Sequence, residues 1–294
     1  MPSPARLRPV ALVCSVLFAV ACCTTEGSAR DEPSGQKPTS PATPATPEDE
    51  PQQAPTRPPP EPGPRPRVGE CRALTAQDIA APGDDTPPVP CATRHTAQTF
   101  SVAGIPRAVL AGRSEPDAEA IAAYVTPRCE RRFARWIGGD VEARVLSRLH
   151  PVWFLPTDAD VRLGARWYRC DVIAYAEGDR PARLPRDVEQ VLSTPEGLTE
   201  FGVCSKGSPE RPGSVRVMCG RGSHTWRAFT AARLGGRDRP FPGRRARREA
   251  RRECSEAART ELGFPLEWLF GWQPPSRAAW RTGARHGLCW VPTS

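Results

Sequence analysis

The chain has 294 residues, among them 36 prolines and 11 cysteines, and its formal net charge at pH 7 is +8. This length allows more than one domain of ordinary size, and the positive charge favours anionic partners. The apolar run Val10–Cys22 is shorter than the roughly 20 apolar residues that a membrane-spanning helix needs, so it is not read as a transmembrane segment.

The first 22 residues have the pattern of a signal peptide. Arg6 and Arg8 precede the apolar run, which ends in the small residues Ala19-Val-Ala21 directly before Cys22. This ending resembles the bacterial lipobox, in which the cysteine receives a lipid, although Ala19 stands where leucine is usual. We expect residues 1–22 to be a lipoprotein-type signal peptide and Cys22 to anchor the chain on the outer face of the cell membrane. Secretion without an anchor, or an uncleaved anchor, is the alternative.

Residues 23–67 form a tether in this interpretation. The segment is rich in proline, threonine and glutamate and contains almost no large apolar residue. Such a composition cannot bury enough surface to offset the entropy lost on ordering, so we expect a disordered, extended spacer.

The folded part then repeats one set of landmarks twice. In each half a Cys leads to His-Thr and a Phe follows the His five residues later: Cys91, His95 and Phe100 in the first half, Cys219, His224 and Phe229 in the second. The closing segments align without a gap through Gly164 and Gly283. The period is the size of a small domain, so we expect a tandem duplication. The expected boundaries are residues 68–177 for copy 1, 178–200 for a connector and 201–294 for copy 2.

The elements of copy 1 follow from apolar periodicity and turn signals. A strand or hairpin is expected over Val89–Ile105, and a helix over Pro116–Ile137 that is interrupted at Thr126-Pro127. Strands are expected over Leu149–Leu155 and Ala165–Ala176, with a short helical turn opened by Thr157 between them.

Copy 2 repeats this order. The pattern predicts a strand at Val215–Ala232, a helix from Gly243 to Leu262 and a strand at Leu266–Trp272. A turn from Ser276 and a last strand at Arg285–Val291 follow. The fold class is therefore α+β, with a small antiparallel sheet and one main helix in each copy.

Each copy carries four cysteines, and an exported chain keeps such cysteines paired. Four cysteines allow three connectivities. We favour joining the first to the second and the third to the fourth, because this keeps each bridge local and sets the helical cysteine against the final strand. The expected disulfides are Cys71–Cys91, Cys129–Cys170, Cys204–Cys219 and Cys254–Cys289.

These residues together resemble a known family. Gly69-Glu-Cys71, then Val89-Pro-Cys91 with His95, a helical cysteine and a final Trp280-x-x-Gly283-x-Arg285 before Cys289 are similar to the septum formation domain of actinobacterial envelope proteins. Copy 1 has Val161 in place of the tryptophan. The resemblance implies an extracytoplasmic, often lipid-anchored protein associated with septum formation, and it brings no catalytic residues.

The candidate chemistry is limited. His95 and His224 are matched between the copies, and a Cys-x3-His or Cys-x4-His pair is able to begin a zinc site. No second His or carboxylate recurs in step, so we expect two structural histidines beside the disulfides, with no catalytic, metal or cofactor site. A wall-acting hydrolase or metal-dependent enzyme using His95 or His224 is the alternative.

The strongest charge feature lies on the helix of copy 2. On helical spacing, five arginines form one basic face: Arg244, Arg247, Arg248, Arg251 and Arg252. The face is suited to anionic lipid, a wall polymer or an acidic division protein, and export argues against nucleic acid. A solvated face without a partner is the alternative. The sequence therefore predicts a non-catalytic, lipid-anchored binding or scaffolding protein of the cell envelope.

Overall fold

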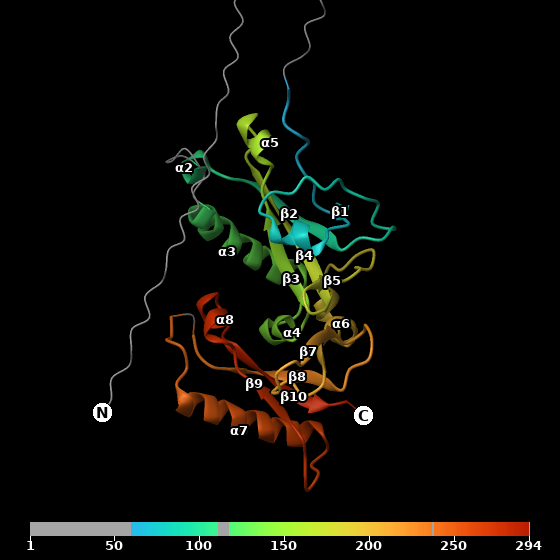
Figure 1. The fold of residues 1–294 in the computed structure, drawn as a ribbon, viewed down its shortest axis with the longest axis vertical. Coiled ribbons are helices and arrows are strands. Elements are labelled where there is room, and N and C mark those ends of the chain that lie inside the picture. Colours follow the sequence, from blue (N-terminus) through green and yellow to red (C-terminus); the bar gives the residue numbers. More distant parts are fainter. Residues whose placement is uncertain (1–59, 111–117, 237, 294) are drawn as a thin grey trace, which may run out of the picture. The chain divides into compact units, whose positions relative to one another are not determined.

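The chain folds into helices packed against antiparallel strands. The computed structural model describes residues 60–110, 118–236 and 238–293, and Figure 1 shows the arrangement of their elements. The strands are β1 Cys71–Arg72, β2 Ala97–Gly104, β3 Leu149–Phe154, β4 Trp167–Glu177, β5 Arg180–Pro181, β6 Val203–Lys206, β7 Val215–Met218, β8 Trp226–Arg233, β9 Gly271–Gln273 and β10 His286–Pro292. The helices are α1 Ala76–Ala80, α2 Arg107–Leu110, α3 Ala118–Trp136, α4 Val141–Val145, α5 Asp158–Arg162, the 3-10 turn η1 Val191–Ser193, α6 Pro195–Phe201, α7 Arg244–Glu261 and α8 Arg277–Arg281.

In the first half, β4 is the central strand. It pairs antiparallel with β2 on one side and β3 on the other, and β1 extends the sheet beyond β2. Helix α3 packs on these strands through Ile121, Val125, Cys129 and Phe133, which recur every four residues and are all buried. This four-residue spacing places the apolar side chains in one stripe, and the stripe fixes which side of α3 faces the sheet.

In the second half, β10 takes the central place between β8 and β9. Helix α7 covers these strands, and its buried residues are Ala250, Cys254 and Ala258. These small side chains let the helix approach the sheet closely, so the long arginine side chains around them project past the contact.

The pairing order β2–β4–β3 in the first half has the same form as β8–β10–β9 in the second half. The two groups of strands are joined, because Glu177 in β4 pairs with Val217 in β7. Further backbone hydrogen bonds cross the join, from Arg148 N–H to the Phe201 carbonyl (2.7 Å) and from Val203 N–H to the Leu146 carbonyl (2.8 Å). Along the described residues the strands thus form one continuous hydrogen-bonded sheet.

The expected connector, residues 178–200, is packed into the core. Leu184, Val188 and Leu192 are buried in the same apolar cluster as α3 and β4, and this cluster also contains Phe201 and Met218 from the second half. The apolar contacts therefore run without a break from one half into the other.

Three expected elements differ from the structure. Helix α3 continues through Pro127 without the interruption that its sequence predicted, because buried residues on both sides of the proline hold the helix to the sheet and outweigh the missing backbone donor. The single strand expected at Val215–Ala232 is two strands, β7 and β8. The strand expected at Leu266–Trp272 begins only at Gly271, and the residues before it form an irregular loop.

The Gly-x-Arg element has the same local structure in both halves. Gly164 and Gly283 adopt φ angles of +103° and +106°, the region that favours glycine, directly after α5 and α8. The following Arg166 and Arg285 turn back to the helix end, where each Nη1 donates to a carbonyl five residues earlier, at 2.9 and 2.6 Å. The same carbonyls also accept from the backbone N–H of Gly164 and Gly283, so the arginine adds a side-chain donor that holds the following residues to the helix end.

The four disulfides join the pairs that the sequence favoured: Cys71–Cys91, Cys129–Cys170, Cys204–Cys219 and Cys254–Cys289. Two of them fasten the long helices to the central strands, α3 to β4 and α7 to β10. The bridges close sequence separations of 20, 41, 15 and 35 residues, and each reduces the entropy of the unfolded chain.

The signal peptide, Cys22 and most of the tether lie outside the described residues. From residue 60 onward the tether region contacts the fold: the backbone N–H of Gly63 donates to a carboxylate oxygen of Asp160 at 2.6 Å, and this bond lowers the pKa of Asp160. Among the described residues, no helix is both long and apolar enough to cross a membrane.

Candidate functional site

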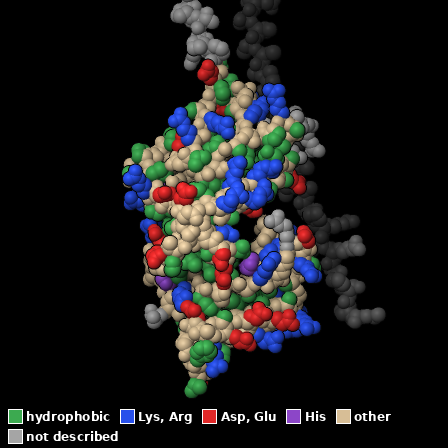
Figure 2. Space-filling model, turned by 180° about the vertical axis from the view of Figure 1, so that it is seen from behind, with side chains coloured by type: hydrophobic (Ala, Val, Ile, Leu, Met, Phe, Trp, Pro, Cys, Tyr) green, Lys and Arg blue, Asp and Glu red, His purple; other side chains and the backbone are tan. Residues whose placement is uncertain are grey.

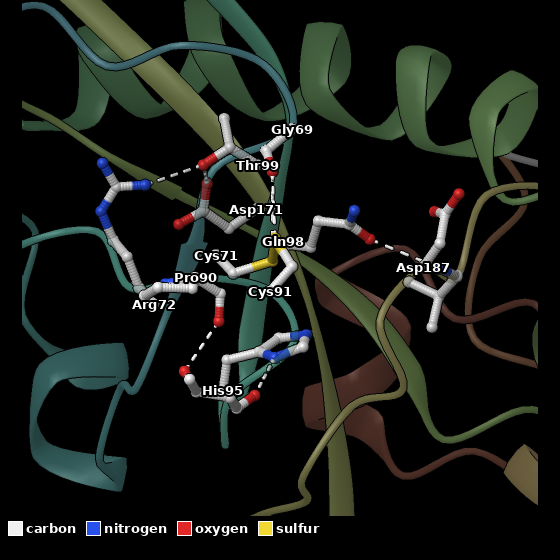
Figure 3. Close-up of a disulfide and its surroundings, with 12 residues drawn as sticks. Gly69, Cys71, Arg72, Pro90, Cys91, His95, Gln98, Thr99, Asp171 and Asp187 are labelled. Carbon is white, nitrogen blue, oxygen red and sulfur yellow. Dashed lines mark hydrogen bonds between the residues drawn. A yellow bond between two sulfur atoms is a disulfide. The ribbon is translucent and has the colours of Figure 1, made fainter.

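The repeated Cys-His stretch forms a buried structural corner in the first half. Figure 3 shows His95 on one side of the Cys71–Cys91 bridge and a group of polar side chains, Arg72, Thr99 and Asp171, on the other. His95 is 1% exposed, and its Nδ1 lies 2.9 Å from the Thr93 carbonyl oxygen. His224 repeats this contact with the Gly222 carbonyl at 3.4 Å, from a less buried position. Each histidine therefore makes the same local contact, from its ring Nδ1 to the carbonyl oxygen two residues earlier.

The surroundings of these histidines do not form a metal cluster. Within the part of the chain that the structure describes, no group of three or more His, Cys, Asp or Glu side chains is placed to hold a metal ion. The cysteines next to both histidines are in disulfides, which removes the thiolates a zinc ion would need. The Nε2 atom of His95 is buried and has no hydrogen-bond partner among the described residues.

A buried network of charged groups fills the other side of this corner, and sequence reasoning missed it. The guanidinium of Arg169 donates to Asp171 at 2.9 Å and also pairs with Asp84. Asp171 accepts from Thr99, which lies directly opposite it on β2, at 2.7 Å, and Thr99 in turn accepts from Arg72. Burial opposes the charge of Arg169, but Asp171 and Asp84 raise its pKa above the ordinary value. The network fixes the loop that carries Asp84 against the sheet.

The second half has no equivalent of this network. Its gapless alignment places Leu288 and Trp290 where β4 has Arg169 and Asp171, and Trp290 is fully buried. The two strands therefore bury different side chains at these aligned positions. A buried ion-pair network stabilises weakly compared with apolar packing, so its value lies in fixing one loop position.

The five arginines of α7 do not form one exposed face. Arg244, Arg248 and Arg252 are exposed, and none of the ion pairs among the described residues involves them. Arg247 instead turns toward the body of the protein, with its guanidinium 5.6 Å from the Phe241 ring centroid. Arg251 is ion-paired with Glu210 at 2.9 Å. Helical geometry places position 247 on the side of the buried residues Ala250 and Cys254, and this corrects the expected face.

We call the exposed arginines Arg244, Arg248, Arg252 and Arg259 the α7 stripe. They recur at intervals of four, four and seven residues, so they lie along one side of the helix. Arg259 lies over the Trp268 ring at 5.2 Å, and the Trp268 Nε1–H donates to Ser255 on the same helix at 3.2 Å. The loop after α7 therefore folds back beside the end of the stripe.

That loop exposes large apolar side chains. Leu266 is 95% exposed, Phe264 65% and Leu269 61%. In Figure 2 hydrophobic side chains occupy the lower end of the molecule, where Figure 1 shows the loop between α7 and β9. We name residues 262–270 the apolar loop. Trp268 and Phe270 are half-buried at its base, whereas Trp272 is buried in β9 as expected for a strand residue.

A cavity of about 740 Å³ lies between the loop before α7 and helix α8. Four arginines line it, Arg239, Arg277, Arg281 and Arg285, together with the rings of Phe241 and Trp280. We name it the arginine pocket. The sequence contained its signal in the Trp280-x-x-Gly283-x-Arg285 element, but the contribution of Arg239 from a separate loop is visible only in the structure.

A larger groove, about 950 Å³, runs between α4, α6, β8 and α7. Its carboxylates already have partners: Glu142 accepts from the Thr230 hydroxyl and from the Ala231 N–H at 2.9 Å, and Glu261 pairs with Arg227. These contacts hold α4 and α7 to β8. The groove therefore has the character of a packing seam.

Comparison with known proteins gives one assignment. No curated protein and no solved structure matches the chain. The family model described as Septum formation matches residues 68–289, about three quarters of the chain and all of the folded part apart from its last residues. The chain therefore belongs to the septum formation family.

Proposed function

We propose that this chain is a non-catalytic binding protein of the cell envelope that takes part in septum formation. In this proposal it is exported, held at the outer face of the membrane by a lipid on Cys22, and carried on the proline-rich tether of residues 23–67. Family membership supports the role in septum formation. The four disulfides are suited to an oxidising compartment outside the cytoplasm.

We also propose that the folded part arose by duplication. Both halves have a short strand that carries the first disulfide cysteine, a long helix fastened to the central strand, a short helix closed by glycine, and a central strand between two neighbours. The halves have since diverged, because one buries an ion-pair network and the other buries apolar side chains at the same positions.

The observation that carries the binding role is the α7 stripe continued by the apolar loop. Exposed arginines that form no close ion pair attract an anionic surface, and protruding leucine and phenylalanine side chains gain free energy on leaving water. A few apolar side chains on one loop, bordered by arginines, are too small a patch for a stable protein interface of about 1,000 Å². The arrangement instead fits the headgroup region of an anionic bilayer, as in proteins that lie on a membrane surface.

The membrane contact is tested with vesicles. The exported chain carrying Cys22→Ala, so that no lipid anchor contributes, is mixed with vesicles containing or lacking anionic lipid, and binding is measured by flotation. At about 1 kcal/mol per arginine near such a surface, R244A/R248A/R252A should lower the partition constant roughly 100-fold on anionic vesicles. Leu266→Ser should weaken binding to the same vesicles by reducing insertion. In wild type the tryptophan fluorescence should shift to the blue when Trp268 enters the bilayer, and this shift should be smaller in the Leu266→Ser variant.

The matched control is R131A/R135A/R162A, which removes three exposed arginines from the first half. If this control lost as much vesicle binding as R244A/R248A/R252A, the net charge of the protein alone would explain the attraction. That result would overturn the assignment of membrane binding to the α7 stripe. The cellular role is tested by following a tagged chain in dividing cells. Septal enrichment that requires Cys22 supports the proposal, whereas uniform distribution or release of the wild-type chain into the medium contradicts it.

A further inference from the structure

The arginine pocket has an unbalanced charge. Four guanidinium groups line it, and the carboxylate among its lining residues is that of Asp238. Among the described residues, Arg239, Arg277 and Arg281 take part in no ion pair, whereas other arginines of this half, such as Arg227 and Arg251, do. Gathering like charges around one cavity costs free energy, and an anion bound there would offset the cost.

Two arginines of the pocket are held by aromatic rings. The guanidinium of Arg277 lies 4.7 Å from the Phe241 ring centroid, and that of Arg285 lies 4.3 Å from the Trp280 ring. The two rings meet edge to face at 5.9 Å. Stacking on a ring fixes the plane of a guanidinium while its N–H groups stay directed outward at the edge of that plane. These arginines are therefore ordered before any ligand binds.

The far wall of the pocket is fixed by hydrogen bonds. The Nε1–H of Trp280 donates to the Arg239 carbonyl at 3.1 Å, which joins α8 to the loop before α7. Arg285 donates through Nε to the Gly236 carbonyl at 3.1 Å and through Nη1 to the Trp280 carbonyl. Arg285 thus supports the wall, while Arg277 and Arg281 on α8 and Arg239 on the loop before α7 are exposed and remain to contact a ligand.

The first half has other residues at two of the corresponding positions. The gapless alignment puts Asp158 opposite Arg277 and Val161 opposite Trp280, so one ligand-facing arginine and the ring that orders Arg285 are both missing there. In addition, the Asp160 carboxylate accepts from Gly63, on the chain that leads in from the tether. The same helical turn therefore carries two arginines in one half, whereas in the other it carries two aspartates and one arginine, and one of the aspartates accepts a hydrogen bond from Gly63.

We propose that the arginine pocket binds a phosphate ester group. Planar guanidinium groups match the paired oxygens of phosphate, and Arg277, which lies over the Phe241 ring, loses little entropy on binding. The excess of positive charge favours a phosphate monoester, with two negative charges, or the successive phosphodiesters of a polymer, with one charge each, over a single carboxylate. This site is separate from the α7 stripe, because its arginines come from α8 and from the loop before α7. It would hold a phosphate of an envelope polymer while the stripe contacts the membrane.

The test uses the exported chain carrying Cys22→Ala and measures binding of pyrophosphate, glycerol phosphate and acetate by isothermal titration calorimetry. Both phosphates should bind, and acetate should bind at least tenfold more weakly. R277A/R281A should lower phosphate affinity at least tenfold without a change in melting temperature. R277K/R281K keeps the charge but loses the planar donors. Its phosphate affinity should lie between those of wild type and R277A/R281A.

The matched control is R183A/R186A, which removes two exposed arginines from a second basic cavity of about 480 Å³. Phosphate affinity should be unchanged in this variant. An equal loss in the control, or full affinity in R277A/R281A, would overturn the proposal. If R277A/R281A unfolds, Trp280→Phe, which removes the hydrogen bond to the Arg239 carbonyl, provides the second test through a smaller loss of phosphate affinity.

The source of the phosphate is separated by two further probes. A soluble poly(glycerol phosphate) chain should bind wild type and lose affinity in R277A/R281A but not in R244A/R248A/R252A. If the pocket serves a polymer, binding to vesicles that contain phosphatidylglycerol should be lost in R244A/R248A/R252A and kept in R277A/R281A. If vesicle binding also requires Arg277 and Arg281, a lipid headgroup occupies the pocket. If only the vesicle binding of R244A/R248A/R252A were unchanged from wild type, the proposed membrane contact would be refuted, whereas the proposed phosphate site would still stand.

Discussion

Arg169 and Asp171 form an ion pair in the interior of the sheet, with 2.9 Å between the Arg169 Nε and an Asp171 carboxylate oxygen and side chains 2% and 1% exposed. The two residues are neighbours on one face of β4, since alternate residues of a strand share a face. Taking such charges from water is costly, and the pair persists because Asp84 and Thr99 complete its hydrogen bonds.

Removing one member of this pair should therefore be severe. Asp171→Ala leaves the Arg169 charge buried beside a single remaining carboxylate, and we expect a loss of about 3–5 kcal/mol in the free energy of unfolding. Urea unfolding followed by tryptophan fluorescence measures it. The control is Glu249→Ala, which breaks the exposed Arg245–Glu249 pair and should leave the unfolding midpoint unchanged. Equal midpoints for all three proteins would show that the network contributes nothing.

The disulfides should differ in their resistance to a reductant. Cys91 and Cys219 are partly exposed, whereas both sulfurs of Cys129–Cys170 and of Cys254–Cys289 are buried. Because a reductant must reach a sulfur atom, mild phosphine treatment of the folded protein should open the first bridge of each half before the helix-to-strand bridges. Thiol labelling and peptide mass spectrometry give the order. Simultaneous labelling of all eight cysteines under native conditions would contradict this expectation.

The helix-to-strand bridges should also carry more stability. Replacing Cys129 and Cys170 together by alanine removes a cross-link over 41 residues, and we expect a loss of about 2–5 kcal/mol. The corresponding change at Cys204 and Cys219 removes a link over 15 residues and should cost less. Chemical unfolding of both variants compares them. A larger loss for the shorter loop would show that strain or packing, and not chain entropy, sets the effect.

Gly287 has a packing role in β10. A Cβ atom at this position would overlap the six-membered ring of Trp272, which lies across it from the neighbouring strand. We expect Gly287→Ala to destabilise the protein by about 1–3 kcal/mol through overpacking. Gly236→Ala, whose added Cβ meets no atom within 4 Å, is the control and should melt like wild type. Thermal unfolding of the two variants measures the difference.

His150 should make the protein less stable in mild acid. Loss of surrounding water, and then the charges of Arg148 and Arg216, lower its pKa from 6.5 to about 4, and its ring packs on Tyr175. As the pH falls from 6.5 toward 4, the unfolded chain takes up a proton that the folded chain does not, so the free energy of unfolding decreases. Below about 4 both states are protonated and the effect levels off. His150 as a whole residue is exposed, so the direction of the pKa shift, and not its size, carries this prediction.

The measurement compares wild type with His150→Gln. Urea midpoints at pH 7 and pH 4.5 should differ less in the variant, because glutamine does not titrate while all other groups remain. Proton NMR of the imidazole should place its titration midpoint well below 6.5. A midpoint at the ordinary value would remove the basis for the predicted acid sensitivity.

Much of the local structure follows from short stretches of sequence. Thr157 and Ser276 cap α5 and α8 by accepting from backbone N–H groups three residues later, and Gly164 and Gly283 end the same helices. These features depend on residues within one or two helical turns, so the expected turns occur where predicted. The cysteine pairing could be inferred in the same way, because local bridges are the simplest connectivity of each half.

The candidate surfaces could be inferred only in part. The arginine run of α7 was evident, but which arginines face water depends on where Cys254 meets β10, and this contact turned Arg247 inward. In the apolar loop, the alternation of leucine, tryptophan and phenylalanine is typical of a strand and predicts one. Whether these residues form a strand depends on pairing with β10, and of this stretch β10 pairs only with Gly271–Gln273.

The sequence by itself determined the repeated order of elements, the helix ends and the disulfide pairs, because each depends on spacing along a short length of chain. Tertiary structure decided the join of β4 to β7, the buried Arg169 network and the arginine pocket. Each of these brings together residues from distant parts of the chain, such as Asp84 with Arg169 and Arg239 with Trp280. Periodicity assigns a side chain to one face of a strand or helix, whereas the partner that covers that face is set by packing between elements far apart in sequence.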